Sequence, residues 1–192
     1  MTRSVVTVVV FACSVVFAGS AQAQPVASLS GDPSSFFERL FGGPVSPTAR
    51  RVIFWDGAQR SGTIVISTSE RRLYFVLGNG QAIQYGIGVG RPGFTWTGTR
   101  TISMKREWPA WSPPAAMLRR RPDLPRHMPG GLDNPLGARA LYLGSSMYRI
   151  HGSNEPQTIG YAVSSGCIRM TNADVIDLYS RTQIGTKVVV LR

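Results

Sequence analysis

Short runs of β-branched and aromatic residues, bounded by glycine or proline, are the feature of this chain that most restricts its fold. Thr63–Ser67 and Arg72–Leu77 each have the length of one strand. Gly78-Asn79-Gly80 supplies the positive-φ residues of a tight turn, and Gln81–Val89 alternates well enough to be the returning strand. This strand lacks side chains at three alternate positions, Gly86, Gly88 and Gly90, which indicates bending or a close approach of another backbone.

The rest of the chain repeats this pattern with few helices. Further strands are expected at Thr99–Trp108, Arg139–Leu143, Met147–Ile150 and Thr186–Leu191, the last of them buried. Asn172-Ala173-Asp174 is expected to cap a helix whose apolar face runs through Val175, Ile176, Leu178 and Tyr179. We therefore predict a mostly β fold with a few short α-helices.

Seven prolines between residues 109 and 139 interrupt the strand pattern. The residues from Pro113 predict one short helix, since proline suits a first helical turn, and Arg119-Arg120-Arg121 follows. A segment of this length inside a compact domain is typical of a lid or binding element, and a proline-stiffened surface excursion is the equal alternative. His127 is interpreted as a loop residue without a catalytic role.

The first residues have the order of a secretory signal peptide. Arg3 precedes an apolar run from Val5 to Phe17, and Ala21-Gln22-Ala23 forms a cleavage site, so residues 1–23 are predicted to be removed, Cys13 with them. A retained membrane anchor is the alternative, but the run is short for a span of about 20 residues. A Ser/Pro/Gly-rich linker is expected at residues 24–50, with one amphipathic turn near Ser35–Phe41, followed by a single domain over residues 51–192.

Export and charge restrict the partners. The predicted location is the periplasm, where the mature chain keeps one cysteine, which is a free reactive thiol or pairs with another protein. The net charge of +11 shows no nucleic-acid-binding pattern, so nucleic acid is not an expected partner. Attraction to an anionic wall or membrane surface and a generally basic solvated surface are equally good interpretations.

The stretch Tyr148–Met170 holds His151 and Cys167. A thiol is nucleophilic as thiolate, and a nearby imidazole is the usual way to activate it. The small residues Ser164-Ser165-Gly166 leave room for an incoming carbonyl, and the Gly166 and Cys167 amides are candidate donors to an oxyanion. A structural cysteine beside a core histidine is the alternative, though a polar, glycine-containing turn is poor core filling.

HGSN, a spacer and SSGCIRM together resemble the signature of the L,D-transpeptidase (YkuD-like) family. The matching positions are His151, Gly152, Ser164, Gly166, Cys167, Ile168 and Arg169. The departure is Ser165, where many members carry a second histidine. The general sequence pattern resembles the family from about Val52 to the C-terminus. The resemblance implies a sheet that wraps into a barrel-like sandwich.

The resemblance also implies roles for these residues. Cys167 is the expected nucleophile and His151 its base, while Gly152, Gly166 and Ser165 orient the histidine or serve the oxyanion. Arg169 and Ser164 are expected to contact the substrate. Asp174 and Asp177 are interpreted as a helix cap and a solvated face rather than as a third catalytic group.

The implied reaction is acyl transfer on peptidoglycan. Cys167 attacks a tetrapeptide donor stem and passes the acyl group to an amine, either of a second stem, giving a 3-3 cross-link, or of an outer-membrane protein. No metal or organic cofactor is required, and acylating β-lactams of the carbapenem type are expected inhibitors. Three alternatives remain: an L,D-carboxypeptidase or thiol hydrolase, a zinc site from His127, His151 and Cys167, and a non-catalytic wall-binding module.

Overall fold

The computed structural model of the chain describes residues 46–192. The predicted signal peptide, most of the predicted linker and the amphipathic turn near Ser35–Phe41 lie outside the described residues. Within residues 46–192 strands predominate, as predicted, and no helix combines the length and the apolar composition that crossing a membrane requires.

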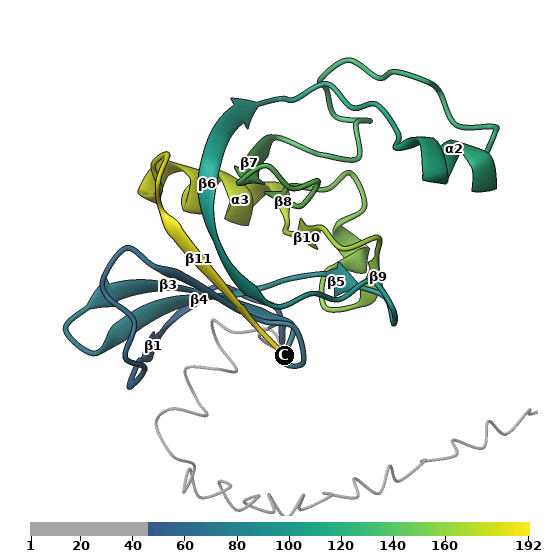
Figure 1. The fold of residues 1–192 in the computed structure, drawn as a ribbon. Helices are drawn as coiled ribbons and strands as arrows, with labels where there is room; N and C mark the ends of the chain where they lie inside the picture. Colours follow the sequence, from purple (N-terminus) through teal and green to yellow (C-terminus); the bar gives the residue numbers. More distant parts are fainter. Residues whose placement is uncertain (1–45) are drawn as a thin grey trace, which may run out of the picture. The chain divides into compact units, whose positions relative to one another are not determined.

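Nine strands form one continuous, strongly bent sheet in the order β1-β4-β3-β2-β11-β6-β7-β8-β10 (Figure 1). They are β1 (Arg51–Phe54), β2 (Ile64–Ser67), β3 (Arg72–Gly78), β4 (Gln81–Gly86), β6 (Gly98–Glu107), β7 (Arg139–Leu143), β8 (Arg149–His151), β10 (Ile168–Arg169) and β11 (Lys187–Leu191). The β3–β4 hairpin turns at Gly78-Asn79-Gly80, and all three residues have the predicted positive φ.

Strand β6 joins the two halves of the sheet. Its first residues pair with β11, Thr99 lying opposite Val189, whereas its later residues pair with β7, Arg106 lying opposite Ala140. The register shifts between Ile102 and Met104, and Figure 1 shows the strand curving from one half of the sheet to the other. A bulged, bending strand of this kind lets one sheet turn a corner.

Backbone pairing between Gly88 and Arg169 closes the structure on itself. Gly88 N–H donates to Arg169 O at 2.8 Å, and Arg169 N–H donates back to Gly88 O at 2.9 Å. Beside this bridge β5 (Val89–Gly90) pairs in parallel with β9 (Ala162–Ser164). The edge strand β10 is thereby linked to the segment that continues β4, which gives the barrel-like sandwich that the family resemblance implies.

The glycines of this segment have the close approaches that the sequence predicts. A Cβ atom at Gly86 would lie 2.5 Å from Thr48, and one at Gly90 would lie 2.6 Å from the carbonyl oxygen of Phe94. The chain consequently leaves the regular β4 ladder after Gly86 and resumes as β5, so the single strand predicted for Gln81–Val89 is two.

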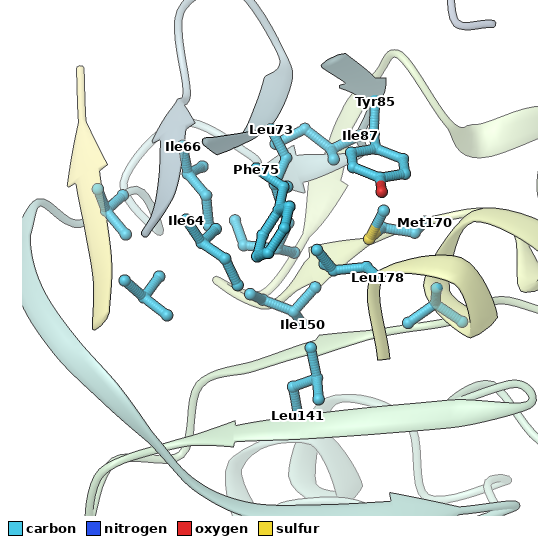
Figure 2. Packing of buried hydrophobic residues seen from close by; sticks show 14 of the residues in the cluster. Ile64, Ile66, Leu73, Phe75, Tyr85, Ile87, Leu141, Ile150, Met170 and Leu178 are labelled. Carbon is cyan, nitrogen blue, oxygen red and sulfur yellow. The ribbon is translucent and has the colours of Figure 1, made fainter. Parts of the chain in front are cut away.

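Buried hydrophobic side chains from both halves of the sheet meet in one core (Figure 2). Ile64, Leu73 and Phe75 come from the first half, and Ile150 comes from β8. Leu178 of α3 (Asn172–Arg181) completes this core and is fully buried. Because Ile150 lies between Arg149 and His151, the residue that anchors β8 also orients its neighbours away from the core.

Two predicted boundaries and one predicted burial differ from the structure. The N-cap of α3 is Thr171, whose hydroxyl accepts a hydrogen bond from Asp174 N–H at 3.1 Å, rather than the predicted Asn172–Asp174 segment. Strand β8 begins at Arg149, two residues later than predicted. Strand β11 is only half-buried, because Lys187 and Leu191 at its ends are exposed.

Candidate active site

Four chemically active side chains occupy one face of the parallel pair β8–β10. His151 lies opposite Arg169 in the strand register, and Ile150 lies opposite Ile168. The two isoleucines are buried in the core. Because side chains alternate along a strand, Arg149, His151, Cys167 and Arg169 lie on the other face, and all four line one pocket. The fold therefore brings the predicted nucleophile and base together, and adds Arg149, which the sequence analysis missed.

His151 is buried and held in one orientation. Its Nδ1 lies 2.6 Å from the carbonyl oxygen of Gly152, and because a carbonyl only accepts, Nδ1 carries the proton. The lone pair is then on Nε2, the other ring nitrogen. Gly152 thus makes the orienting contact that was predicted for it. A Cβ atom at this position would clash with Asn172 Oδ1, so glycine is required for this packing.

The turn that carries Cys167 is held by three neighbouring groups. The Ser164 hydroxyl donates to Cys167 O at 2.6 Å and accepts from Gly166 N–H at 3.1 Å. The Trp96 indole donates to Gly166 O at 2.9 Å and stacks on Tyr148 with ring centroids 4.5 Å apart. Gly166 has a φ of 109°, a region that glycine alone adopts readily.

This arrangement changes two of the predicted roles. The Gly166 N–H already bonds to Ser164, so the prediction that it donates to an oxyanion is wrong for this geometry. Ser164 is buried and donates its only hydroxyl proton within the turn, so it holds the nucleophile rather than binding substrate. Among residues 46–192 the Cys167 N–H has no acceptor and stays the available oxyanion donor. Ser165 is exposed beside the pocket.

The electrostatics of the pair favour neutral groups at neutral pH. Burial lowers the pKa of His151 to about 4, partly opposed by the bond to Gly152 and reinforced by the charges of Arg169 and Arg149. Burial raises the pKa of the Cys167 thiol, while Arg149 and then Arg169 act in the other direction. The site therefore holds a neutral thiol and a neutral imidazole with its lone pair on Nε2, which are suited to proton transfer during attack.

The pocket has a volume of about 380 Å³. Its wall is formed by residues close to His151 and to Cys167 in the sequence and by residues of the proline-rich segment. Residues of that segment in the wall are Trp111, Pro114, Ala116, Met117, Arg120, Pro135 and Leu136. Phe94, Met147 and Tyr148 complete the apolar part of the wall. The predicted helix is present as α2 (Ala115–Arg120), and its residues Ala116, Met117 and Arg120 lie in the pocket wall.

A small backbone clamp positions α2. Trp111 and Met128 exchange two backbone hydrogen bonds of 2.8 Å, which closes the base of the loop that carries the helix. Asn134 is buried behind it and donates to Pro129 O at 2.9 Å. The proline-rich segment is thus a structured arm rather than an unsupported excursion.

Of the three arginines that line the pocket, the two on β8 and β10 differ in their surroundings. Arg169 pairs with Glu155 at 3.2 Å, whereas Arg149 makes no ion pair within residues 46–192. The Arg149 guanidinium lies over the Tyr142 ring, 4.9 Å from its centroid. The buried Nε atoms of both arginines have no hydrogen-bond partner in the described residues.

Other predicted groups lie elsewhere. No group of three possible metal ligands occurs among residues 46–192, and His127 contacts Ser112 at 3.3 Å in the arm, so the zinc alternative has no ligand set there. Asp177 does not lie on a solvated face as predicted. It accepts from Tyr85 at 2.6 Å and pairs with Arg181 and Arg50, and the bond from Arg181 lowers its pKa to about 2.

Comparison with known proteins gives this geometry a family. The model of the YkuD L,D-transpeptidase catalytic domain matches residues 61–190, which include the whole Cys167–His151 region. The chain belongs to the L,D-transpeptidase catalytic domain family.

Two relatives from Escherichia coli K12 share this L,D-transpeptidase domain. The probable L,D-transpeptidase YcfS is 40% identical over 144 residues, covering 70% of this chain and 45% of the relative. The probable L,D-transpeptidase YbiS is 36% identical over 156 residues, covering 77% and 49%. The chain thus spans about half the length of these relatives.

A solved L,D-transpeptidase has the same fold. L,D-transpeptidase 3 from Mycobacterium tuberculosis, solved with a faropenem-derived adduct, superposes with a TM-score of 0.53 at 19% identity. The match covers 68% of this chain and 60% of that one. At this identity the likeness concerns the fold.

Proposed function

We propose that this protein is a peptidoglycan L,D-transpeptidase in which Cys167 is acylated by a tetrapeptide donor stem and the acyl group passes to an amine. The observation that carries the proposal is that one pocket is lined by both the Cys167 thiol and the His151 imidazole, whose Nδ1 is held by Gly152. Membership of the family supports the same reaction.

In the first step His151 Nε2 accepts the thiol proton as the sulfur attacks the donor carbonyl. A bond forms between Sγ and the carbonyl carbon, and the Cys167 N–H donates to the oxyanion. His151 then returns the proton to the departing amine as the C–N bond breaks, which releases the terminal D-alanine and leaves a thioester.

In the second step an amine attacks the thioester carbonyl, so that a C–N bond forms and the C–S bond breaks. His151 Nε2 takes the proton from the amine and passes it to the leaving sulfur, which frees the thiol. The acceptor is the side-chain amine of a second stem, giving a 3-3 cross-link, or a lysine of an outer-membrane protein. Transfer to water instead is the carboxypeptidase reaction. Phe94, Met117 and Tyr148 give the pocket an apolar wall, which supports transfer to an amine over hydrolysis.

The proposal includes the location and the inhibitors. Export of the mature protein to the periplasm is supported by Arg3, the apolar run and the Ala21-Gln22-Ala23 site. Carbapenem-type β-lactams are proposed to acylate Cys167, since a family member of the same fold has been solved with a faropenem-derived adduct.

Incubation with a purified disaccharide tetrapeptide, followed by intact-protein and muropeptide mass spectrometry, tests the reaction. The expected products are an acyl adduct on Cys167, free D-alanine and a 3-3 cross-linked dimer. Release of a tripeptide without any dimer, in the presence of excess acceptor, would support the carboxypeptidase reaction instead. Absence of both products and adduct would sink the proposal.

A further inference from the structure

The pocket around Cys167 contains positive charge without negative charge. Arg120, Arg149 and Arg169 line it, and none of its lining residues is an aspartate or glutamate. Arg169 is partly neutralised by Glu155 at 3.2 Å, and Arg120 lies on the exposed surface of α2. Arg149 is therefore the one pocket cation that is both close to the thiol and without an acidic partner in the described residues.

The strand register places Arg149 beside the thiol. Ile168 lies opposite Ile150, so one residue earlier Cys167 lies across from Arg149 on the pocket face. Stacking on Tyr142 fixes one side of the guanidinium without neutralising its charge.

We propose that Arg149 binds the C-terminal carboxylate of the donor stem and so selects donors that end one residue after the attacked carbonyl. This rests on the proposed function. In such a donor the terminal carboxylate is three bonds from the carbonyl carbon, which makes it the anionic group closest to the sulfur. One extra residue moves that carboxylate by about 3.5 Å, beyond a contact fixed next to Cys167. Arginine suits this task because its planar fork holds a carboxylate through two N–H groups.

Release of the terminal D-alanine removes this carboxylate together with the leaving group. Arg149 is then free again beside the thioester. An acceptor amine without a carboxylate on the neighbouring carbon makes no use of this contact, so with such an acceptor the contact acts on the donor half-reaction alone. A variant at this position should lose donor selectivity without losing the capacity of an existing thioester to react with amines.

The first measurement is the rate of Cys167 acylation by a tetrapeptide and by the same peptide with a C-terminal amide. The parent protein should prefer the free acid by about 10²-fold, the value of a charge-assisted pair. Arg149→Gln should reduce this preference to within a few-fold of unity by raising KM for the acid, and Arg149→Lys should restore part of it. Arg106→Gln removes the same charge from an exposed site on β6 and should keep the parent preference.

The second measurement does not depend on transpeptidation. Iodoacetate and iodoacetamide alkylate the same thiol and differ in a carboxylate, so their rate ratio reports carboxylate binding beside Cys167, and changes in thiol pKa cancel. The ratio at the Cys167 peptide should fall about tenfold in Arg149→Gln and stay at the parent value in Arg106→Gln. An unchanged ratio in Arg149→Gln, or a loss confined to Arg169→Gln, would overturn the proposal, even if the protein proves to have another reaction.

Discussion

At the scale of single residues, the site depends on two neutral groups that exchange one proton. Gly152 O fixes the proton on Nδ1 of His151, and burial keeps the ring neutral by disfavouring a second proton on Nε2. A backbone carbonyl carries no charge, so it orients the ring without the acidic third group that many cysteine and serine hydrolases use. A neutral imidazole held by a carbonyl therefore activates a thiol far better than a hydroxyl, because a thiol is much easier to deprotonate than an alcohol.

The first prediction concerns this pair. Cys167→Ala should abolish acylation, and Cys167→Ser should be almost as inactive because an alcohol is much harder to deprotonate. His151→Gln should slow acylation by about 10²–10⁴-fold, the usual effect of losing a positioned base. The measurement is the rate of adduct formation by intact-protein mass. Asp174→Asn is the control and should be acylated at nearly the parent rate. An adduct that still forms on the Cys167→Ala protein would contradict the assignment.

Some of these residues were readable from the sequence and others were not. Cys167 and His151 stand in a long motif, and Arg149 could have been found from strand alternation, since it is two residues before His151. Trp96 and Asn172 could not, because they reach the site only through tertiary packing: the Trp96 indole bonds to Gly166 O, and Asn172 Oδ1 accepts from Ala138 N–H.

At the scale of elements, the arm that carries α2 forms one wall of the pocket. Met117 and Leu118 are neighbours on this helix and are both partly buried, but only Met117 lines the pocket. The helix has no buried residue of its own, so its position depends on the clamp between Trp111 and Met128.

The second prediction uses this difference. Met117→Ala should raise KM for the donor about fivefold, since it removes roughly 1 kcal/mol of apolar contact, and should leave kcat nearly unchanged. Leu118→Ala is the matched control and should leave KM within twofold of the parent. Steady-state kinetics with a soluble tetrapeptide provides the test, and equal effects of the two substitutions would mean that the arm does not contact the donor.

The third prediction concerns the start of α3. Thr171→Ala removes the side-chain acceptor for Asp174 N–H and should lower the free energy of unfolding by about 1 kcal/mol. Thr171→Ser keeps the hydroxyl and should lose much less. Urea unfolding monitored by circular dichroism measures both. A cost for serine as large as that for alanine would show that the threonine methyl group, rather than the cap, stabilises this position.

The element boundaries show where sequence patterns were sufficient. Strands β2 and β3 were predicted closely, and β1 was not predicted. The hairpin of β3 and β4 is local, since Gly78-Asn79-Gly80 joins the two strands. Strands β9 and β10 were missed because each is short and its partners are separated from it in the sequence: β9 pairs with β5, and β10 pairs with β8 and bridges to Gly88. The N-cap was misplaced because threonine and asparagine both cap helices, and only packing against Ala138 shows that Asn172 is engaged elsewhere.

At the scale of the whole domain, folding and catalysis share the buried histidine. His151 lies in the part of the molecule where β8 packs Ile150 into the core, and the charges of Arg149 and Arg169 face the same pocket. A protonated imidazole here would be buried beside two guanidinium groups. The folded state therefore excludes a proton that the unfolded chain binds readily.

The last prediction is a stability change in mild acid. The pKa of His151 is about 4 in the folded state and about 6.5 in an unfolded chain. Since the folded pKa is the lower one, the contribution to stability is complete above pH 6.5 and is lost as the pH falls toward 4. Asp177, with a pKa of about 2, acts in a separate window below the ordinary aspartate value. Urea titrations between pH 4 and pH 7 should therefore show a falling free energy of unfolding for the parent and for His127→Gln, and a flatter profile for His151→Gln. Parallel profiles for the parent and His151→Gln would mean that the buried imidazole is protonated as easily in the folded protein as in the unfolded chain.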